Sequence, residues 1–115
     1  MPRYFIGMYQ PQGVVPSDEI LGPVMRDMGA YMGELQAGGK LVFSNGFDQS
    51  AHPSVVTSDG TSIDVTPGSY LESEIQLGGF TIVDVEDEDE AHAVATRLAE
   101  ITHLPIEVRL FADRP

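Results

Sequence analysis

A glutamate and an arginine near the end of the chain have the residue types and the spacing of a small charged site. Glu107 and Arg109 are separated by one residue within the apolar run at residues 106–111. Because alternate side chains of a strand project to opposite faces, we expect both charges on the same face. An Arg guanidinium could there bind a small organic anion, such as a carboxylate, through two parallel hydrogen bonds. The same pair could instead be a structural ion pair, and it could bridge two subunits.

Three further polar residues could take part in binding or catalysis. Tyr70 and Glu72 belong to a short acidic connector that precedes the apolar run at residues 80–85, and we expect them beside a pocket. A carboxylate buried away from water could act as a general acid or base, which makes Glu72 the candidate catalytic residue. The alternative is an acidic surface connector on which Tyr70 is an anchoring aromatic side chain. Asp84 places a charge on an otherwise apolar strand face, so it is a further candidate contact.

No pattern typical of metal binding, nucleophilic catalysis or phosphate binding accompanies these residues. His52, His92 and His103 lack close ligand spacing. The acidic run at residues 86–90 lacks the glycine and the spaced final glutamate of a calcium-binding loop, so we expect it to cap a helix. There is no G-x-S-x-G motif and no phosphate-binding glycine loop. We therefore expect neither a metal nor a cofactor.

The composition indicates one acidic globular domain over residues 1–115. The chain has 18 Asp plus Glu against 6 Lys plus Arg, a net charge of −12. This charge opposes binding to nucleic-acid phosphates and to an anionic membrane surface. Cysteine is absent, no apolar run reaches the roughly 20 residues that span a bilayer, and the first residues lack a signal-peptide layout. We expect a cytoplasmic protein that binds neither nucleic acid nor membranes.

The elements that must position the candidate side chains follow from the spacing of the apolar residues. Residues 3–9 and 80–85 are predicted strands with apolar side chains on both faces. Apolar residues three and four apart predict an amphipathic helix over about residues 18–37, with Gly22-Pro23 as an alternative start. Within this helix, Gly29 and Gly33 are costly unless they pack closely against a neighbouring element or leave room for a ligand. Both interpretations remain open.

Glycines and turn residues predict a hairpin and a flexible joint between these elements. Asp59-Gly60 is flanked by two runs of strand-forming residues, which predicts a hairpin with a two-residue turn. Gly78-Gly79 is expected to be a flexible joint at the edge of the strand at residues 80–85. One face of the hairpin is expected to be apolar and the other wet. The apolar face consists of Val56, Ile63 and Val65.

A second helix and two further strands complete the predicted elements. Asp87 and Glu90 have the spacing of a helix-capping pair. Residues 40–47 and 106–111 are predicted strands. The buried stripe of the second helix is expected to consist of Ala91, Val94, Ala95, Leu98 and either Ile101 or Thr102.

Together these elements predict an α+β fold. Without the hairpin, their order is that of the ferredoxin-like βαββαβ plan, with both helices on one face of the sheet. Strands that are apolar on both faces, covered by only two helices, leave the opposite face of the sheet bare. A bare apolar face of several hundred Å² is unusual in a monomer. We therefore expect a homodimer that packs sheet against sheet.

The stretch PGSYLESEIQLGGFTIVDVEDEDEA at residues 67–91 resembles the signature of the DGPF-type branch of the YCII-related proteins. That signature runs T-D-G-P-F, an E-x-K-E connector, L-G-G-F, a hydrophobic strand and an acidic D-x-D-E-A helix start. The closing IEVRLF at residues 106–111 is similar to the family's final I-E-V-R-P strand. The resemblance covers nearly the whole chain in element order and implies a dimeric α/β barrel. The residues that keep to the signature are Thr66, Gly68, Tyr70, Glu72, Leu77, Gly78, Gly79, Phe80, Glu90 and Ala91.

The chain departs from the family pattern at positions that bear on catalysis. Pro67 stands where the signature has Asp, Ser69 where it has Pro, and Glu74-Ile75 where it has Lys-Glu. Other YCII-related members carry a His on the first helix, proposed as half of a His-Asp pair, and Met28 takes its place here. These departures favour a binding protein over an enzyme.

Two classes of function therefore stand side by side. The first is a dimeric module that binds a small molecule or another protein without catalysis. The second is a cofactor-independent enzyme that acts on a small carboxylate or aromatic substrate, with Glu72 as acid or base and Arg109 as anion clamp. In both, we expect a pocket near the first helix, the connector and the last strand. Its candidate ligand contacts are Arg109, Tyr70, Tyr31, Met28 and Asp84.

Overall fold

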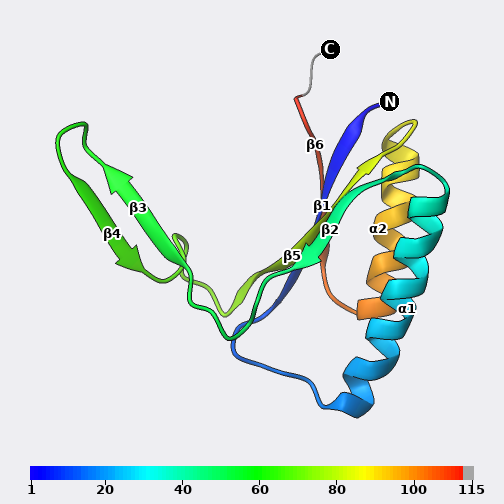
Figure 1. The fold of residues 1–115 in the computed structure, drawn as a ribbon, viewed down its shortest axis with the longest axis horizontal. Helices are drawn as coiled ribbons and strands as arrows, with labels where there is room; N and C mark the ends of the chain where they lie inside the picture. Colours follow the sequence, from blue (N-terminus) through cyan, green and yellow to red (C-terminus); the bar gives the residue numbers. More distant parts are fainter. Residues whose placement is uncertain (113–115) are drawn as a thin grey trace.

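The structure is a computed structural model that describes residues 1–112 of the chain (Figure 1). Its elements follow the predicted order of strand, helix, strand, hairpin, strand, helix and strand. The strands are β1 (Arg3–Pro11), β2 (Leu41–Gly46), β3 (Ser54–Ser58), β4 (Ile63–Pro67), β5 (Ile75–Asp84) and β6 (Ile106–Leu110). The helices are α1 (Asp18–Ala37) and α2 (Glu88–Thr102). The predicted α+β class is confirmed.

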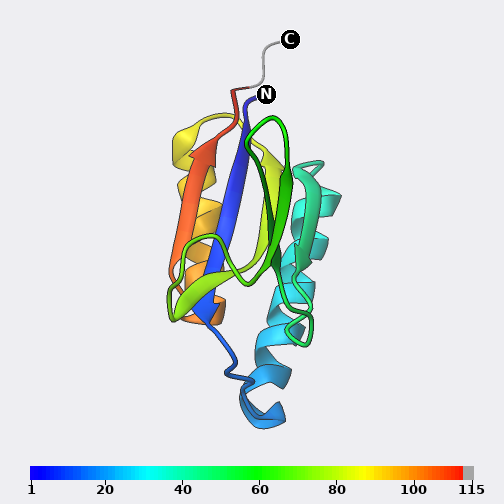
Figure 2. The same cartoon turned by 90° about the vertical axis from the view of Figure 1, so that its left-hand side faces the viewer.

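Four of the strands form one antiparallel sheet in the order β2-β5-β1-β6. Strands β3 and β4 pair with each other in a separate two-stranded sheet. Both helices lie on the same face of the four-stranded sheet (Figure 1), and Figure 2 shows the sheet with the helices behind it. This arrangement matches the split βαβ plan of ferredoxin-like domains. The opposite face of the sheet carries no helix and is called the bare face below.

The hydrophobic core lies between the sheet and the two helices. Ile6 of β1 and Val83 of β5 are almost completely buried there. In α1, only Leu35 near the C-terminal end of the helix is buried. The buried residues of α2 are those that the spacing predicted, and of the two alternatives for the last position it is Ile101 that is buried: Ala91, Val94, Ala95, Leu98 and Ile101. The core is therefore built mainly on α2, and most of α1 packs against the sheet less tightly.

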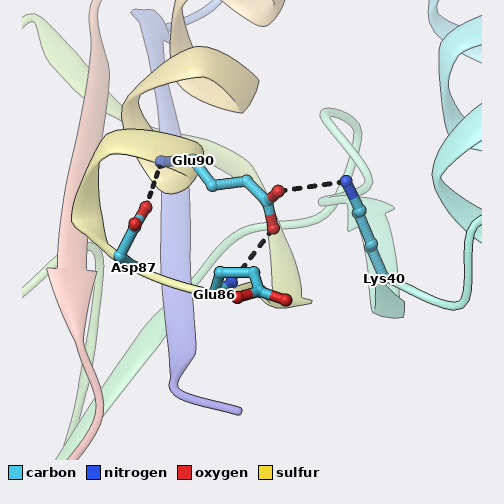
Figure 3. Close-up of polar contacts among 4 residues, drawn as sticks. All are labelled: Lys40, Glu86, Asp87 and Glu90. Carbon is cyan, nitrogen blue, oxygen red and sulfur yellow. Dashed lines mark hydrogen bonds and ion pairs between the residues drawn. The ribbon is translucent and has the colours of Figure 1, made fainter.

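The acidic run before α2 caps the helix, as predicted (Figure 3). The Asp87 side chain accepts a hydrogen bond from the Glu90 backbone N–H at 2.9 Å. The Glu90 carboxylate accepts one from the Glu86 backbone N–H at 3.0 Å and one from Lys40 Nζ at 3.2 Å. These two bonds, the one from Glu86 first, lower the pKa of the Glu90 carboxyl. Glu90 thus joins the start of α2 to the segment that follows α1.

The prediction of a flexible joint at Gly78-Gly79 is wrong, because both glycines lie inside β5. The register between β1 and β5 shifts at this point, and Gly78 is the extra residue of a β-bulge. A Cβ atom on Gly79 would lie 2.7 Å from the backbone oxygen of Asn45 in β2. Glycine is required here by the close approach of a neighbouring strand, a tertiary contact that glycine spacing does not reveal.

The hairpin differs from its prediction in its turn and in its exposure. Ser58 pairs with Ile63, so the loop has four residues, 59–62, instead of two. The longer loop is closed by the Asp59 carboxylate, which accepts hydrogen bonds from two backbone N–H groups within it. The predicted apolar face exists but is exposed like the opposite face, because the hairpin stands away from the rest of the chain (Figure 1). Its residues are Val56, Ile63 and Val65.

Candidate functional site

The bare face carries a cluster of three polar side chains from β1 and β6. Ile106 and Val108 of β6 pack against the core. Alternation along the strand therefore places Glu107 and Arg109 on one face, as predicted, and this is the bare face. The Tyr9 hydroxyl donates a hydrogen bond to Glu107 Oε1 at 2.9 Å, and Arg109 Nε lies 3.3 Å from the same oxygen. Tyr9 was not predicted as a site residue, because its partnership depends on how β1 pairs with β6.

The electrostatics of this cluster limit what it can bind. The hydrogen bond to Glu107 is the main cause that raises the pKa of the Tyr9 hydroxyl. Burial and the negative charge of Glu107 raise this pKa further, whereas the positive charge of Arg109 lowers it. Tyr9 therefore remains a neutral hydrogen-bond donor near neutral pH. The Arg109 side chain is 71% exposed and lies at the rim of an open depression of about 490 Å³. An anion that binds Arg109 must compete with the Glu107 carboxylate.

Four phenylalanines of β1, β2, β5 and the residue that follows β2 form an aromatic cluster on the bare face, and two of them, Phe47 and Phe80, also border the cleft described below. The Phe80 ring centroid lies 5.4 Å from that of Phe5, 5.8 Å from that of Phe43 and 5.9 Å from that of Phe47. The tilted and edge-on geometries are favourable arrangements for aromatic rings. Phe43 and Phe47 remain 48% and 50% exposed. The chain itself therefore covers this aromatic surface only in part.

Asp84 lies on the bare face, at the end of the sheet away from Tyr9. It is opposite Arg3 in the register of β1 and β5, and Arg3 Nε lies 2.9 Å from Asp84 Oδ1. This ion pair balances the negative charge of the carboxylate. The pair of Glu107 and Arg109 is balanced in the same way, so the two ion pairs on the sheet add no net charge to the bare face.

The connector residues Tyr70 and Glu72 do not share a pocket with Arg109. Both Tyr70 and Glu72 are exposed, and Tyr70 retains 78% of its accessible surface. Neither residue lines the depression beside Arg109 or the cleft described next. The geometry of this single chain thus gives Glu72 no enclosed surroundings in which to transfer a proton.

A larger cleft lies on the other face of the sheet, between the sheet and the N-terminal part of α1. Its volume is about 760 Å³. It exists because α1 buries only Leu35 and does not close on the sheet along its full length. Two hydroxyls line it on the sheet side, where Ser44 Oγ and Thr81 Oγ1 are hydrogen-bonded at 2.8 Å. Its apolar lining includes Met8, Val24, Met28, Met32, Leu98 and Ile106.

The surroundings of Gly29 and Gly33 in α1 decide between close packing and room for a ligand. A Cβ atom added to Gly29 or to Gly33 would meet no atom within 4 Å, so close packing is the wrong explanation for both. Gly29 lines the cleft, whereas Gly33 does not. Met28, a candidate ligand contact, lines the same cleft. The cleft thus contains one of the predicted contacts, and Gly29 keeps its wall open.

Tyr31, another candidate contact, lies between the two helices and not in the cleft. The guanidinium carbon of Arg97 in α2 is 6.0 Å from the centroid of the Tyr31 ring. Burial raises the pKa of the Tyr31 hydroxyl, with a smaller contribution from the charge of Glu34, and Arg97 opposes both. In this chain Tyr31 therefore contributes to packing of α1 on α2.

Within residues 1–112, no three His, Cys, Asp or Glu side chains gather closely enough to hold a metal ion. His92, for example, has Glu88 as its neighbour, with Nε2 at 3.6 Å from Glu88 Oε1. Neither helix of this described part is both long and apolar enough to cross a membrane.

Comparison with known proteins connects this fold to one family. The family model described as the YCII-related domain matches residues 3–109 of the 115-residue chain. The match covers both helices, the hairpin and all of the strands except Leu110, the last residue of β6. No curated protein matches the sequence.

Proposed function

The chain belongs to the YCII-related family, and from this premise we propose that it is a dimeric module that binds a small molecule without catalysis. The ligand occupies the cleft between α1 and the sheet. The observation that carries this proposal is the cleft itself. Its volume of about 760 Å³ is within the range of about 300–1,000 Å³ that is usual for small-molecule sites.

The lining of the cleft indicates the chemistry of the ligand. The lining is mainly aliphatic and includes four methionines, whose side chains adapt their shape to irregular apolar molecules. The hydroxyls of Ser44 and Thr81 could exchange their mutual hydrogen bond for one to a ligand. Among residues 1–112, no Lys or Arg lines the cleft, so a charged carboxylate would find no cation from this part of the chain. We therefore propose a mainly apolar ligand with one polar group.

The bare face supports a homodimer formed through the sheets, which would complete a dimeric α/β barrel. Phe43 and Phe47 are about half exposed on this face, and aromatic side chains of this kind are enriched in protein interfaces. The two ion pairs at its ends bring no net charge. Two copies of a chain with a net charge of −12 could thus approach each other here without placing like charges in contact.

A second candidate function is the cofactor-independent enzyme. The hydrogen-bonded Tyr9 and Glu107, together with the exposed Arg109, favour it. A second copy on the bare face could enclose this cluster and leave Arg109 to bind a small organic anion. Glu72 would have to move from its exposed position to act as acid or base, which makes this proposal weaker than the first.

A thermal-shift screen of small apolar and aromatic compounds, including carboxylates, tests both proposals. The test variant is Gly29→Leu, which places a side chain in the cleft, and the matched control is Gly33→Leu. Both positions have open space for the new side chain, and both changes raise helix propensity by up to about 1 kcal/mol. Both variants are therefore expected to fold at least as well as the wild type.

A ligand at about 100 times its Kd stabilises the wild type by about 2.7 kcal/mol, which raises Tm by roughly 10 °C in a domain of this size. We expect the same shift in Gly33→Leu and none in Gly29→Leu. A ligand that stabilises all three proteins equally would exclude the cleft as its site. If that stabilisation is lost only in Arg109→Ala, the anion site on the bare face is favoured instead.

A further inference from the structure

The hairpin of β3 and β4, residues 54–67 and called the arm below, is an amphipathic ribbon with both faces in water. Val56 pairs with Val65, and the neighbouring pair brings Ile63 to the same face. These three side chains are 64%, 65% and 64% exposed, respectively. Thr57 and Asp64 form the next pair on the opposite face. Isolated two-stranded hairpins are marginally stable at best, so the arm needs a surface on which to pack.

The arm projects from the body of the chain as an anchored element. The Gly68 backbone N–H donates a hydrogen bond to the Pro53 backbone oxygen at 2.8 Å, which closes the base of the arm. The Phe47 backbone N–H bonds the Gly78 oxygen at 2.8 Å, which fixes the end of β2 to the sheet. The radius of gyration is 16.2 Å, against about 13 Å for a compact domain of this length. The arm is thus outside the compact body.

The arm and the bare face lie on the same side of the molecule, and the arm diverges from the sheet (Figure 1). Figure 1 shows the arm diverging from the sheet on the side without helices, and Figure 2 shows it in front of the bare face. A body that covers the bare face therefore enters the space beside the arm. One partner can meet both surfaces, which is a reason to assign them a common occupant.

We propose that the arm of each protomer packs its apolar face, Val56, Ile63 and Val65, against the second copy of the chain that covers the bare face. This inference rests on the proposed sheet-to-sheet dimer and adds to it a contact between the arm of each protomer and the other protomer. In a two-fold symmetric pair, both arms make the same contact.

The area that a stable dimer needs supports the assignment. The sheet has four strands, which at about 4.8 Å spacing and about six residues of 3.3 Å rise present roughly 400 Å² in projection. Standard stable interfaces bury about 800 Å² per partner. The accessible area of a face covered with side chains is larger than its projection, and the arm adds apolar surface that extends toward the same partner, so the sheet and the arm together can supply an interface of standard size.

The charge distribution on the arm also suits a second copy of this acidic chain. The apolar face carries only uncharged side chains, which besides the three apolar residues are Ser54, Ser58 and Pro67. The Asp64 carboxylate belongs to the opposite face, and Asp59 lies in the loop at the tip. The arm can therefore approach a partner with a net charge of −12 without placing a carboxylate in the contact.

Two neighbouring substitutions on β3 test this inference. Val56→Lys places a charge on the apolar face, and Thr57→Lys places the same charge one residue further along, on the opposite face. Both positions are exposed, so each variant is expected to fold, which circular dichroism and Tm verify. Sedimentation equilibrium then gives the dimer dissociation constant of the wild type and of both variants.

We expect Val56→Lys to weaken the dimer about 100-fold or more, since a buried contact is lost twice per symmetric pair, and Thr57→Lys to change it less than about 3-fold. Hydrogen exchange at residues 54–58 and 63–67 is expected to slow at concentrations where the wild type is dimeric. A Val56→Lys protein that dimerises as tightly as the wild type overturns the arm contact while leaving the sheet-to-sheet dimer intact. A wild type that is monomeric at all concentrations overturns both proposals.

Discussion

Replacing Phe80 with alanine tests whether a second copy covers the bare face. Phe80 lies at the centre of the aromatic cluster, with three other ring centroids at 5.4, 5.8 and 5.9 Å. Truncating an aromatic residue at the centre of an interface costs about 2 kcal/mol or more. A symmetric dimer contains this residue twice, so Phe80→Ala is expected to lose about 4 kcal/mol of association free energy, a roughly 1,000-fold weaker dimer.

Sedimentation equilibrium over a range of protein concentrations measures this change. Ile20→Ala is the control, because Ile20 is an exposed apolar residue of α1 on the helix side of the sheet, 64% accessible, and outside the proposed interface. Its dissociation constant is expected to stay within about 2-fold of the wild type. If Phe80→Ala does not fold, Phe43→Ala replaces it, since Phe43 is more exposed. Equal dissociation constants for the wild type and the folded variant would refute the proposed interface.

Three further changes test the local structure. Gly79→Ala is expected to lower the free energy of unfolding in urea by about 1–3 kcal/mol, because its Cβ would crowd the β2 backbone; Gly33→Ala, which meets open space, is expected to leave it unchanged or higher. The pKa of Glu90 is lowered in the folded protein, so its contacts stabilise the fold at pH values above the ordinary Glu pKa. This stabilisation is lost as the pH falls through the lower pKa of the folded state. In urea unfolding at a series of pH values, Glu90→Gln is expected to lack this loss of unfolding free energy at acidic pH. The absorbance of the Tyr9 phenolate is expected to appear at lower pH in Glu107→Gln than in the wild type, because the main cause of the raised pKa is removed; an unchanged titration would contradict the assigned hydrogen bond.

The parts of the fold that follow from local periodicity were predictable from the sequence. The first helix was predicted because amphipathic spacing is a property of the helix itself, and of its two possible starts the structure has the earlier one, at Asp18. The same holds for the buried stripe of α2 and for its cap at Asp87. The shared face of Glu107 and Arg109 follows from strand alternation alone. Each of these features depends only on residues close together in the chain.

The features that were missed or wrongly predicted depend on contacts between distant segments. Gly79 is explained by the approach of β2, which glycine spacing does not reveal. Tyr9 finds Glu107 only through the pairing of β1 with β6. The exposure of Glu72 depends on where the connector runs in space. The cleft likewise arises from the angle between α1 and the sheet, although Gly29 was a sequence signal for open space.

The methionines of the chain offer the most direct test of the proposed ligand site. The chain has 5 methionines, and those at positions 8, 25, 28 and 32 line the cleft, whereas Met1 does not. NMR spectra of protein with ¹³C-labelled methionine methyl groups can be recorded during titration with the compound that gives the largest thermal shift. The proposal predicts shifts of the four cleft methyl signals and a constant signal from Met1. A saturating, stabilising ligand that leaves all four cleft signals in place would contradict it.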